Sequence, residues 1–369
     1  MMTLAPHLRT PARFSHGRHL CFAVSFALLG CLAPALLPSA LVEAARGQAP
    51  STSRTNSAVT IVLPPRIVAG QPATLAVLGV DGRLTSGLEV RLGRDLSVTT
   101  DRTGRASFTA PESGVLLAKA SGASVAALVD VSAPANSPPA IRVAPVVSLR
   151  DRFSVCGAAF AGDANANRVK INGQPALVLA ASPACLVVLP GAKAEPGPAT
   201  IWVESPKGQW SAATSLVSLE FEAPNPPLRP GQKSQMRVRV QGWEQPLHLV
   251  AENETPGVLR FLSGDLQEVV TGGGPQNFAL LKVETIRTGD FSFHARLLPA
   301  PDPDAARRYL VAAAPLAPHN LQGKIRRLAG RLSHSSHNFQ AVRRELDRLA
   351  PNTVPDDLRT LLDAARAAL

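Results

Sequence analysis

The chain has 369 residues, and its 38 Lys and Arg residues outnumber its 27 Asp and Glu residues, which gives a formal net charge of +11. This length exceeds that of one ordinary hydrophobic core, so several domains are expected. Aromatic residues form only 4 % of the sequence, and this shortage of stacking platforms argues against nucleic acid as the partner of the basic charge.

Residues 1–44 have the layout of a secretory signal peptide. Arg9, Arg13 and Arg18 precede an apolar run over residues 20–37, and Val42-Glu43-Ala44 provides small residues for cleavage before residue 45. The small polar residues 45–57 then indicate a flexible tether. An extracytoplasmic location follows, in the periplasm, at the cell surface or secreted, and this also argues against a nucleic-acid partner.

Two alternatives to cleavage remain open. The apolar run would serve as an uncleaved membrane anchor, although Pro34 and Pro38 would interrupt its end and it is barely long enough for a bilayer of ~30 Å. Leu28-Leu29-Gly30-Cys31 is similar to a lipoprotein signal, although apolar sequence continues after the cysteine. No second apolar stretch is long enough to span a membrane, so membrane contact is expected only through this segment.

Residues 58–132 consist of short segments with alternating apolar and polar positions, such as Leu88-Glu89-Val90-Arg91-Leu92. Strands at this spacing predict an antiparallel β-sandwich. The runs Gly70-Gln71-Pro72-Ala73 and Asp101-Arg102-Thr103-Gly104-Arg105-Ala106 resemble bacterial immunoglobulin-like domains, in which a hairpin carries the pattern Asp-x-x-Gly-x-Ala. The resemblance implies an immunoglobulin-like fold for this first module. The proline-containing residues 133–139 form a linker.

Residues 140–219 form a second module in which apolar runs alternate with fixed turn residues. The elements are Phe153-x-Val155-x-Gly157, Val169-x-Ile171-x-Gly173, residues 188–190, residues 197–203 and the turn Ser205-Pro206-Lys207-Gly208. This pattern of strands and turns is similar to that of the IPT/TIG domain. The resemblance implies an immunoglobulin-like fold, which is found in surface and receptor proteins. That family fold has no catalytic residues to transfer to this chain.

Two cysteines lie in predicted strands of the second module and depart from the family pattern. Cys156 and Cys185 remain when Cys21 and Cys31 leave with the signal, as an even pair in an oxidising compartment. A disulfide between them is expected. The alternative is two buried free thiols, because cysteine is also a common small apolar core residue.

Residues 220–300 alternate again and predict a third β-sandwich with a weaker family resemblance, and residues 304–369 change to helical spacing. Three short amphipathic helices are predicted, at residues 321–332, 339–349 and 358–365. Their polar faces carry the candidate partner-binding residues, which would dock on an acidic protein or an anionic envelope surface: Lys324, Arg326, Arg327, Arg331, Arg343, Arg344 and Arg348. The alternative is a solvated face on a structural cap of the third sandwich.

The patterns that suggest chemistry are each incomplete. Residues 163–167 have the oxygen spacing of a calcium loop, but Arg168 and Gln174 replace the glycine and glutamate it needs. The His334–His337 pair lacks further ligands, and the glycine-rich residues 271–275 lack the Lys-Ser/Thr of a phosphate loop. We therefore expect a polar loop, a helix–helix turn and a hairpin loop at these positions, and no metal, cofactor or catalytic residue.

Carbohydrate binding is the obvious activity for such sandwiches, and it usually requires exposed aromatic rings. Trp202 and Trp210 flank one turn and are the candidate carbohydrate-binding residues, although at least one of them is expected to pack in the core. No pattern indicates an oligomeric state.

The sequence as a whole predicts a mainly β protein of tandem immunoglobulin-like β-sandwiches with a small C-terminal α-helical region. The predicted function is that of an exported, non-enzymatic modular protein of the bacterial envelope, in adhesion, scaffolding or assembly. Its expected partner is an envelope protein or an anionic envelope polymer. A polysaccharide-binding accessory protein is the alternative, and an enzyme with its site in the third module is a third possibility.

Overall fold

The computed structural model describes residues 59–110, 112–132, 140–222, 229–264, 266–333, 339–349 and 354–369. All of these belong to the second of two compact units, residues 54–369. The expected signal peptide, the tether, the linker at 133–139 and the His334–His337 pair lie outside the described residues. Within the described ranges, no helix is both long and apolar enough to cross a membrane.

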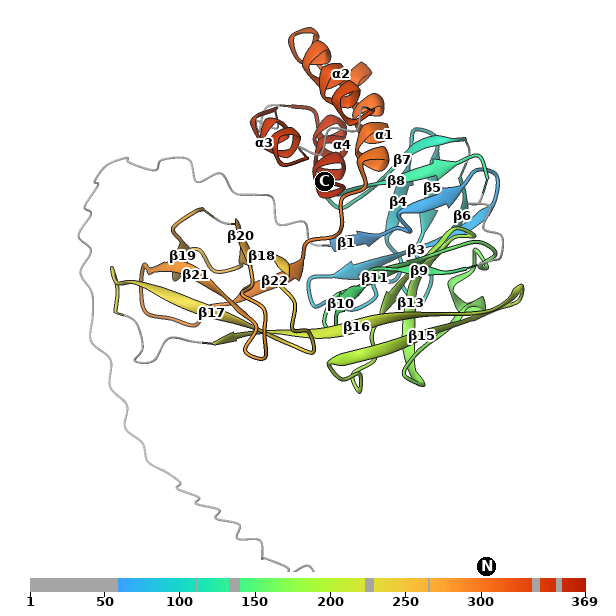
Figure 1. Cartoon of the computed structure of the whole chain (residues 1–369). Helices are drawn as coiled ribbons and strands as arrows, with labels where there is room; N and C mark the ends of the chain where they lie inside the picture. Colours follow the sequence, from blue (N-terminus) through green and yellow to red (C-terminus); the bar gives the residue numbers. More distant parts are fainter. Residues whose placement is uncertain are drawn as a thin grey trace, which may run out of the picture. The chain divides into compact units, whose positions relative to one another are not determined.

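The first sandwich packs two β-layers against each other (Figure 1). One layer has the strand order β2-β8-β7-β4-β5, and in the other β3 pairs with β1 and β6. Ile67, Leu75 and Val90 are fully buried between the layers. The bounds are β1 (Val59–Val62), β2 (Arg66–Val68), β3 (Pro72–Gly79), β4 (Glu89–Leu92), β5 (Leu96–Thr99), β6 (Arg105–Thr109), β7 (Gly114–Ala120) and β8 (Ala123–Asp130).

The Asp-x-x-Gly-x-Ala segment forms the turn that leads into β6. Asp101 Oδ1 accepts hydrogen bonds from the backbone N–H groups of Thr103 (2.7 Å) and Arg105 (3.2 Å). Gly104 has a φ of +71°, and a Cβ there would approach Leu84 Cβ to 2.7 Å. The turn therefore requires an acceptor at its first position and glycine at its fourth.

The second sandwich is built around the apolar alternate positions of its strands, such as Val155, Ile171 and Ile201, which are almost fully buried. Its layers are β9-β11-β14-β13 and β12-β15-β16-β10. The bounds are β9 (Arg142–Val143), β10 (Val146–Ser148), β11 (Phe153–Cys156), the short 3-10 helix η1 (Ala164–Ala166), β12 (Arg168–Ile171), β13 (Gln174–Ala181), β14 (Cys185–Leu189), β15 (Gly197–Ser205) and β16 (Gly208–Glu222).

Polar side chains connect the first two sandwiches. The guanidinium of the buried Arg105 donates to the backbone oxygens of Val178 (2.8 Å) and Leu179 (3.2 Å). Thr74 Oγ1 donates to the backbone oxygen of Gly162 (2.7 Å), and β3 pairs with β13 at Thr74 and Ala181. These bonds satisfy buried polar groups of both sandwiches at once, so they favour one fixed arrangement of the pair.

The third sandwich shares a strand with the second. β16 runs through residues 219 and 220, where the sequence predicts a module boundary, and its second half pairs with β17 (Figure 1). The layers are β16-β17-β21-β19 and β20-β18-β22. The bounds are β17 (Lys233–Gln241), β18 (His248–Asn253), β19 (Leu259–Phe261), β20 (Leu266–Val270), β21 (Phe278–Thr285) and β22 (Phe293–Leu297).

The C-terminal region contains a helix that was not predicted. Asp302 caps it by accepting a hydrogen bond from Ala305 N (2.9 Å), and Pro303 occupies its first turn. The bounds are α1 (Pro303–Ala313), the 3-10 turn η2 (Ala314–Leu316), α2 (His319–Ser333), α3 (Phe339–Leu349) and α4 (Asp356–Ala367). The mainly β class of tandem immunoglobulin-like sandwiches with a C-terminal helical region is confirmed.

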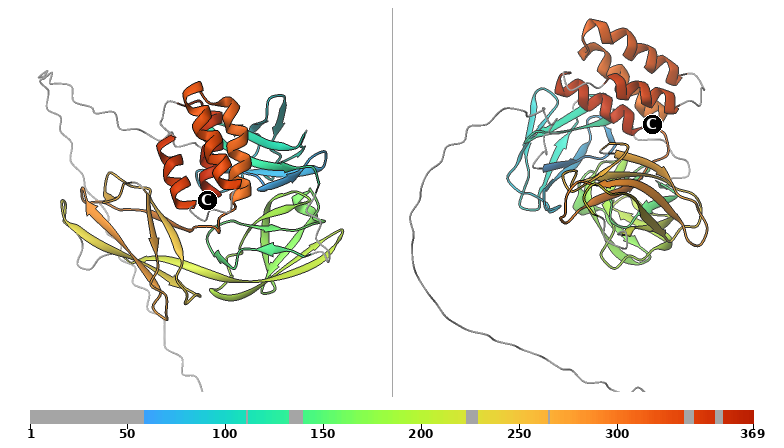
Figure 2. Two further views of the ribbon diagram at one scale, coloured as in Figure 1. Left: turned by 45° about the horizontal axis from the view of Figure 1, so that its top comes forward. Right: turned by 90° about the vertical axis from the view of Figure 1, so that its left-hand side faces the viewer.

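The helices pack mainly on the first sandwich (Figure 2). The alternative of a structural cap on the third sandwich is therefore wrong. Leu128 of β8 is buried in one apolar cluster with Leu310, Leu328 and Leu361 of the helices. Val115 and Leu117 of β7 and Ala126 of β8 are partly buried against the same cluster. The outer face of β7 and β8 therefore provides the apolar surface that the helices cover.

Candidate functional site

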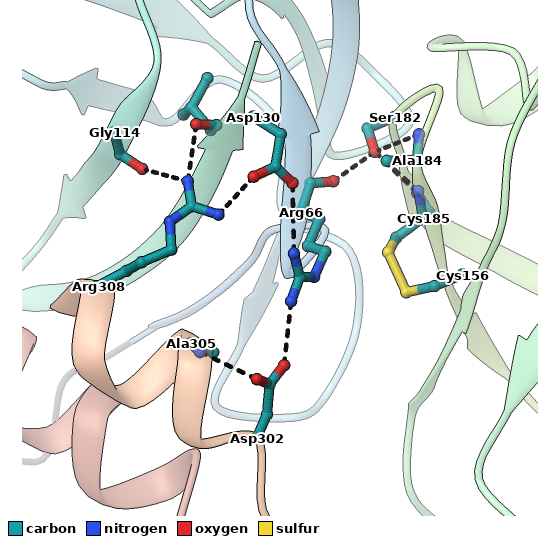
Figure 3. Close-up of polar contacts among 11 residues, drawn as sticks. Arg66, Gly114, Asp130, Cys156, Ser182, Ala184, Cys185, Asp302, Ala305 and Arg308 are labelled. Atoms are coloured by element: carbon teal, nitrogen blue, oxygen red, sulfur yellow. Dashed lines mark hydrogen bonds and ion pairs between the residues drawn. A yellow bond between two sulfur atoms is a disulfide. The ribbon is translucent and has the colours of Figure 1, made fainter. Parts of the chain in front are cut away.

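Two arginines and two aspartates form a network between α1 and the first sandwich, which we call the junction network: Arg66, Asp130, Asp302 and Arg308 (Figure 3). Arg308 Nη1 forms an ion pair with Asp130 Oδ1, and its Nη2 donates to the backbone oxygen of Val129 (3.0 Å). Arg66 pairs with Asp302 (3.1 Å) and with the second oxygen of Asp130 (3.5 Å). The two positive and two negative charges balance.

The local fold places each of these side chains. Asp130 ends β8, and Arg66 begins β2, the parallel neighbour of β8. Asp302 caps α1 with one carboxylate oxygen and binds Arg66 with the other. Burial disfavours the charged form of Arg66, but the hydrogen bond that Arg66 donates to Asp302 and the charges of Asp302 and Asp130 raise its pKa above the ordinary value.

The junction network is suited to holding elements together. Each of its carboxylates is engaged by a guanidinium, so neither is left as an unpaired base beside a nucleophile. Burial raises the pKa of the neighbouring Tyr309 to about 12, which keeps its hydroxyl protonated at neutral pH. No signal in the sequence singled out these residues for a role, although Asp302-Pro303 is an ordinary helix-start pattern.

Further polar contacts attach the helical region elsewhere. The Ser124 and Thr360 hydroxyls share a hydrogen bond (2.5 Å), and Lys119 pairs with Asp357 of α4. Arg343 of α3 pairs with Glu268 of β20 in the third sandwich (2.8 Å). Arg343, one of the predicted partner-binding residues, is thus largely buried and used within the molecule.

The other predicted partner-binding residues are exposed, and we call them the basic face: Lys324, Arg326, Arg327 and Arg331 of α2, and Arg344 and Arg348 of α3. Arg331 pairs with Glu345 of α3 (2.7 Å), and Arg327 donates to Gly323 O within its own helix (3.4 Å). The remaining four form no ion pair with another described residue. The α2 sequence contains no acidic residue, so every fully charged side chain on its exposed side is cationic.

The two candidate carbohydrate-binding tryptophans lie on opposite faces of the β15–β16 hairpin. Val203 is the register partner of Trp210, and Trp202 is the partner of Ser211, so the two rings point to opposite sides. Trp210 faces inward and meets Phe160 edge-to-face at 5.8 Å between ring centroids. Trp202 is 38 % exposed on the outer face. The pair therefore does not form one patch.

The predicted disulfide between Cys156 and Cys185 is confirmed. The two residues are register partners of β11 and β14. Just before β14, Ser182 Oγ donates to the backbone oxygen of Arg66 (2.6 Å) and accepts from Cys185 N (3.0 Å) (Figure 3). This serine therefore links the disulfide-bearing strand to β2, which carries part of the junction network.

The incomplete ligand patterns have structural uses where they are described. Asp163 caps η1 by accepting from Asn165 N (2.9 Å), and the Asn167 amide donates to the backbone oxygens of Ala161 and Asp163. The glycine-rich residues 271–275 connect β20 to β21. Across the described ranges, no group of three His, Cys, Asp or Glu side chains is arranged to hold a metal ion.

No protein-family model matches the chain, and no curated protein matches its sequence. Solved structures with a similar fold include the plexin A4 extracellular region (10% identity, 66% of this chain, TM-score 0.27) and invasin, a bacterial integrin-binding protein (14%, 64%, 0.18). Another is Bacteroides ovatus SGBP-B in complex with a mixed-linkage heptasaccharide (10%, 68%, 0.23). The chain spans 32%, 56% and 74% of those chains, respectively.

The fold defines the class of this chain: a multi-module protein of immunoglobulin-like β-sandwiches. With TM-scores below 0.5, the similar structures give no argument about its function. The finer resemblances, to bacterial immunoglobulin-like domains and to IPT/TIG domains, stay predictions from the sequence.

Proposed function

We propose that the chain is an exported, non-enzymatic scaffold of the bacterial envelope whose basic face binds an anionic envelope polymer. The observation that carries the proposal is the exposed side of α2, which has four cationic residues and no acidic one. Guanidinium groups suit this role because their planar donors match the oxygens of phosphate and carboxylate groups. The disulfide supports export, since such bonds persist in oxidising compartments.

The way in which the helices that carry the basic face are attached to the first sandwich supports a scaffold role. The apolar sides of α2 and α3 are buried with Leu128 of the first sandwich, and the junction network holds α1 to the same sandwich. The cations are therefore presented on a supported surface, which reduces the entropy lost when an extended polymer binds. The paired carboxylates of the junction network favour a non-enzymatic role. On its motif residues, we assign the second sandwich to the IPT/TIG type.

Binding of a soluble poly(glycerol phosphate) to the protein tests this function. Replacing Arg326, Arg327, Arg344 and Arg348 with Gln should weaken binding at least tenfold and reduce its salt dependence, because close charge pairs are lost. The helices should remain intact, since Gln is nearly as good a helix former as Arg.

A matched variant removes four exposed arginines that lie outside the helices: Arg94, Arg102, Arg168 and Arg287. Its net charge equals that of the first variant, so it should keep most of the binding. An equal loss in both variants would show attraction by total charge alone. Unchanged binding in the first variant would leave the basic face as a solvated surface.

A further inference from the structure

A groove of about 360 Å³ lies beside the stretch of β16 that passes from the second sandwich to the third. Its residues come from three separate parts of the chain: the loop after β10, the loop between β14 and β15, and the paired strands β16 and β17. This volume is at the lower end of the range for small-ligand sites, ~300–1,000 Å³. The lining residues relevant to binding are Arg150, Pro196, Ser218, Glu220 and Gln241.

The polar groups of the groove are arranged around one carboxylate. Glu220 accepts hydrogen bonds from Ser218 Oγ (3.2 Å) and from Gln241 Nε2 (3.0 Å), one on each oxygen. A carboxylate offers about four lone-pair sites, so Glu220 can still accept from a ligand. Arg150 supplies donors only, and its exposed side chain forms no ion pair with another described residue.

The walls of the groove are held by close packing. Gly242, next to Gln241, has a φ of +89°, and a Cβ there would meet Leu216 O at 2.5 Å, Gly197 N at 2.6 Å and Pro196 Cβ at 2.8 Å. Only glycine fits such an approach. Pro196, in the loop between β14 and β15, is therefore packed directly against the start of the turn that follows β17. This contact keeps that loop next to the β16 and β17 side of the groove.

We propose that this groove binds a neutral saccharide. Glu220 and Arg150 carry opposite charges, so a charged ligand of either sign would be attracted by one of them and repelled by the other, and neither sign is favoured. Sugar hydroxyls both donate and accept, so one sugar can donate to the carboxylate and accept from the guanidinium at the same time. The apolar C–H face of a sugar ring can pack on the exposed Pro196, which removes apolar surface from water.

This site is separate from the basic face and from Trp202. The groove adjoins the start of β15 at Pro196, whereas Trp202 lies five residues beyond Gly197, about 17 Å along an extended strand. The inference goes beyond the proposed function, and either can fail alone. Loss of sugar binding would not affect binding of an anionic polymer to α2 and α3.

The test uses the mature chain on an array of neutral hexose and N-acetylhexosamine oligosaccharides, followed by calorimetric titration with the strongest hit. We expect Glu220→Ala and Arg150→Ala each to weaken binding at least tenfold, because each removes charge-assisted hydrogen bonds. Trp202→Ala is the matched control and should bind as the original protein does. All three residues have exposed side chains, so unchanged thermal unfolding can verify that the variants fold.

Two results would overturn the inference. One is the absence of binding to every neutral oligosaccharide on the array. The other is binding that Trp202→Ala abolishes while Glu220→Ala leaves it unchanged, which would move the sugar to the outer face of the β15–β16 hairpin.

Discussion

Opening the Cys156–Cys185 disulfide should destabilise the protein by about 3.5 kcal/mol at 25 °C. The two cysteines are 29 residues apart, and the chain-entropy model for a loop of that length gives roughly 12 cal/mol/K. They are also direct partners across β11 and β14, so the strands remain paired in the folded state without the bond. The loss therefore comes mainly from the greater freedom of the unfolded chain.

Guanidinium unfolding of residues 45–369, followed by tryptophan fluorescence with and without a phosphine reductant, measures this difference. The reductant should lower the unfolding midpoint of the original protein and leave that of Cys156→Ala/Cys185→Ala unchanged. The unreduced original protein should also show no titratable thiol after unfolding. Equal midpoints with and without reductant, despite two new thiols, would refute the entropy argument.

The remaining predictions concern the two tryptophans, the junction network and one histidine. Trp210→Ala should lower the free energy of unfolding by about 2–3 kcal/mol, because the Trp210 ring packs on the core. Trp202→Ala should lower it by less than about 0.5 kcal/mol, because Trp202 lies on the outer face. Equal losses in denaturant unfolding would contradict the faces assigned to the two rings. Arg308→Met should cost about 2 kcal/mol and speed hydrogen exchange in α1, and unchanged exchange would argue against a holding role. His294 Nε2 lies 3.1 Å from Asp151 Oδ1, and this hydrogen bond raises the histidine pKa above its unfolded value. The stabilisation is therefore complete below about pH 6.5 and is lost as pH rises through the folded pKa. The free energy of unfolding, measured as a function of pH, should lose this dependence in the variant His294→Asn. The same pH profile in the original protein and in the variant would refute the role of His294.

The sequence predicts the strands well where one face is buried and the other is solvated. Residues 89–92 alternate strictly between exposed and buried positions, as their apolar pattern indicates. Helix α1 could not be found in the same way. Most of its buried positions are alanines, including Ala305, Ala306 and Ala313. Alanine gives little apolar contrast, and the prolines around residue 302 favour a linker, so the helical period is weak.

The candidate sites were harder to predict because they depend on register and on distant parts of the chain. The opposite orientations of Trp202 and Trp210 follow from the pairing of Val203 with Trp210, since a shift of the register by one residue would place both rings on the same face. The groove combines residue 150 with residues 190–196 and 218–241. No local spacing connects these segments, and only the shared strand β16 brings them together.

The docking of the helices on the first sandwich does have a signal in the sequence, which lies in the strands and not in the helices. In β7, Leu116 is buried inside the sandwich, while Val115 and Leu117 on the other face contact the helical cluster. In β8, Leu128 on the outer face is only 1% exposed. A strand that is apolar on both faces must be covered on both faces, because either face left bare would expose apolar surface to water. The helices meet this requirement although 178 residues separate Arg308 from its partner Asp130, so the covered strands, and not nearness in the chain, determine where the helical region packs.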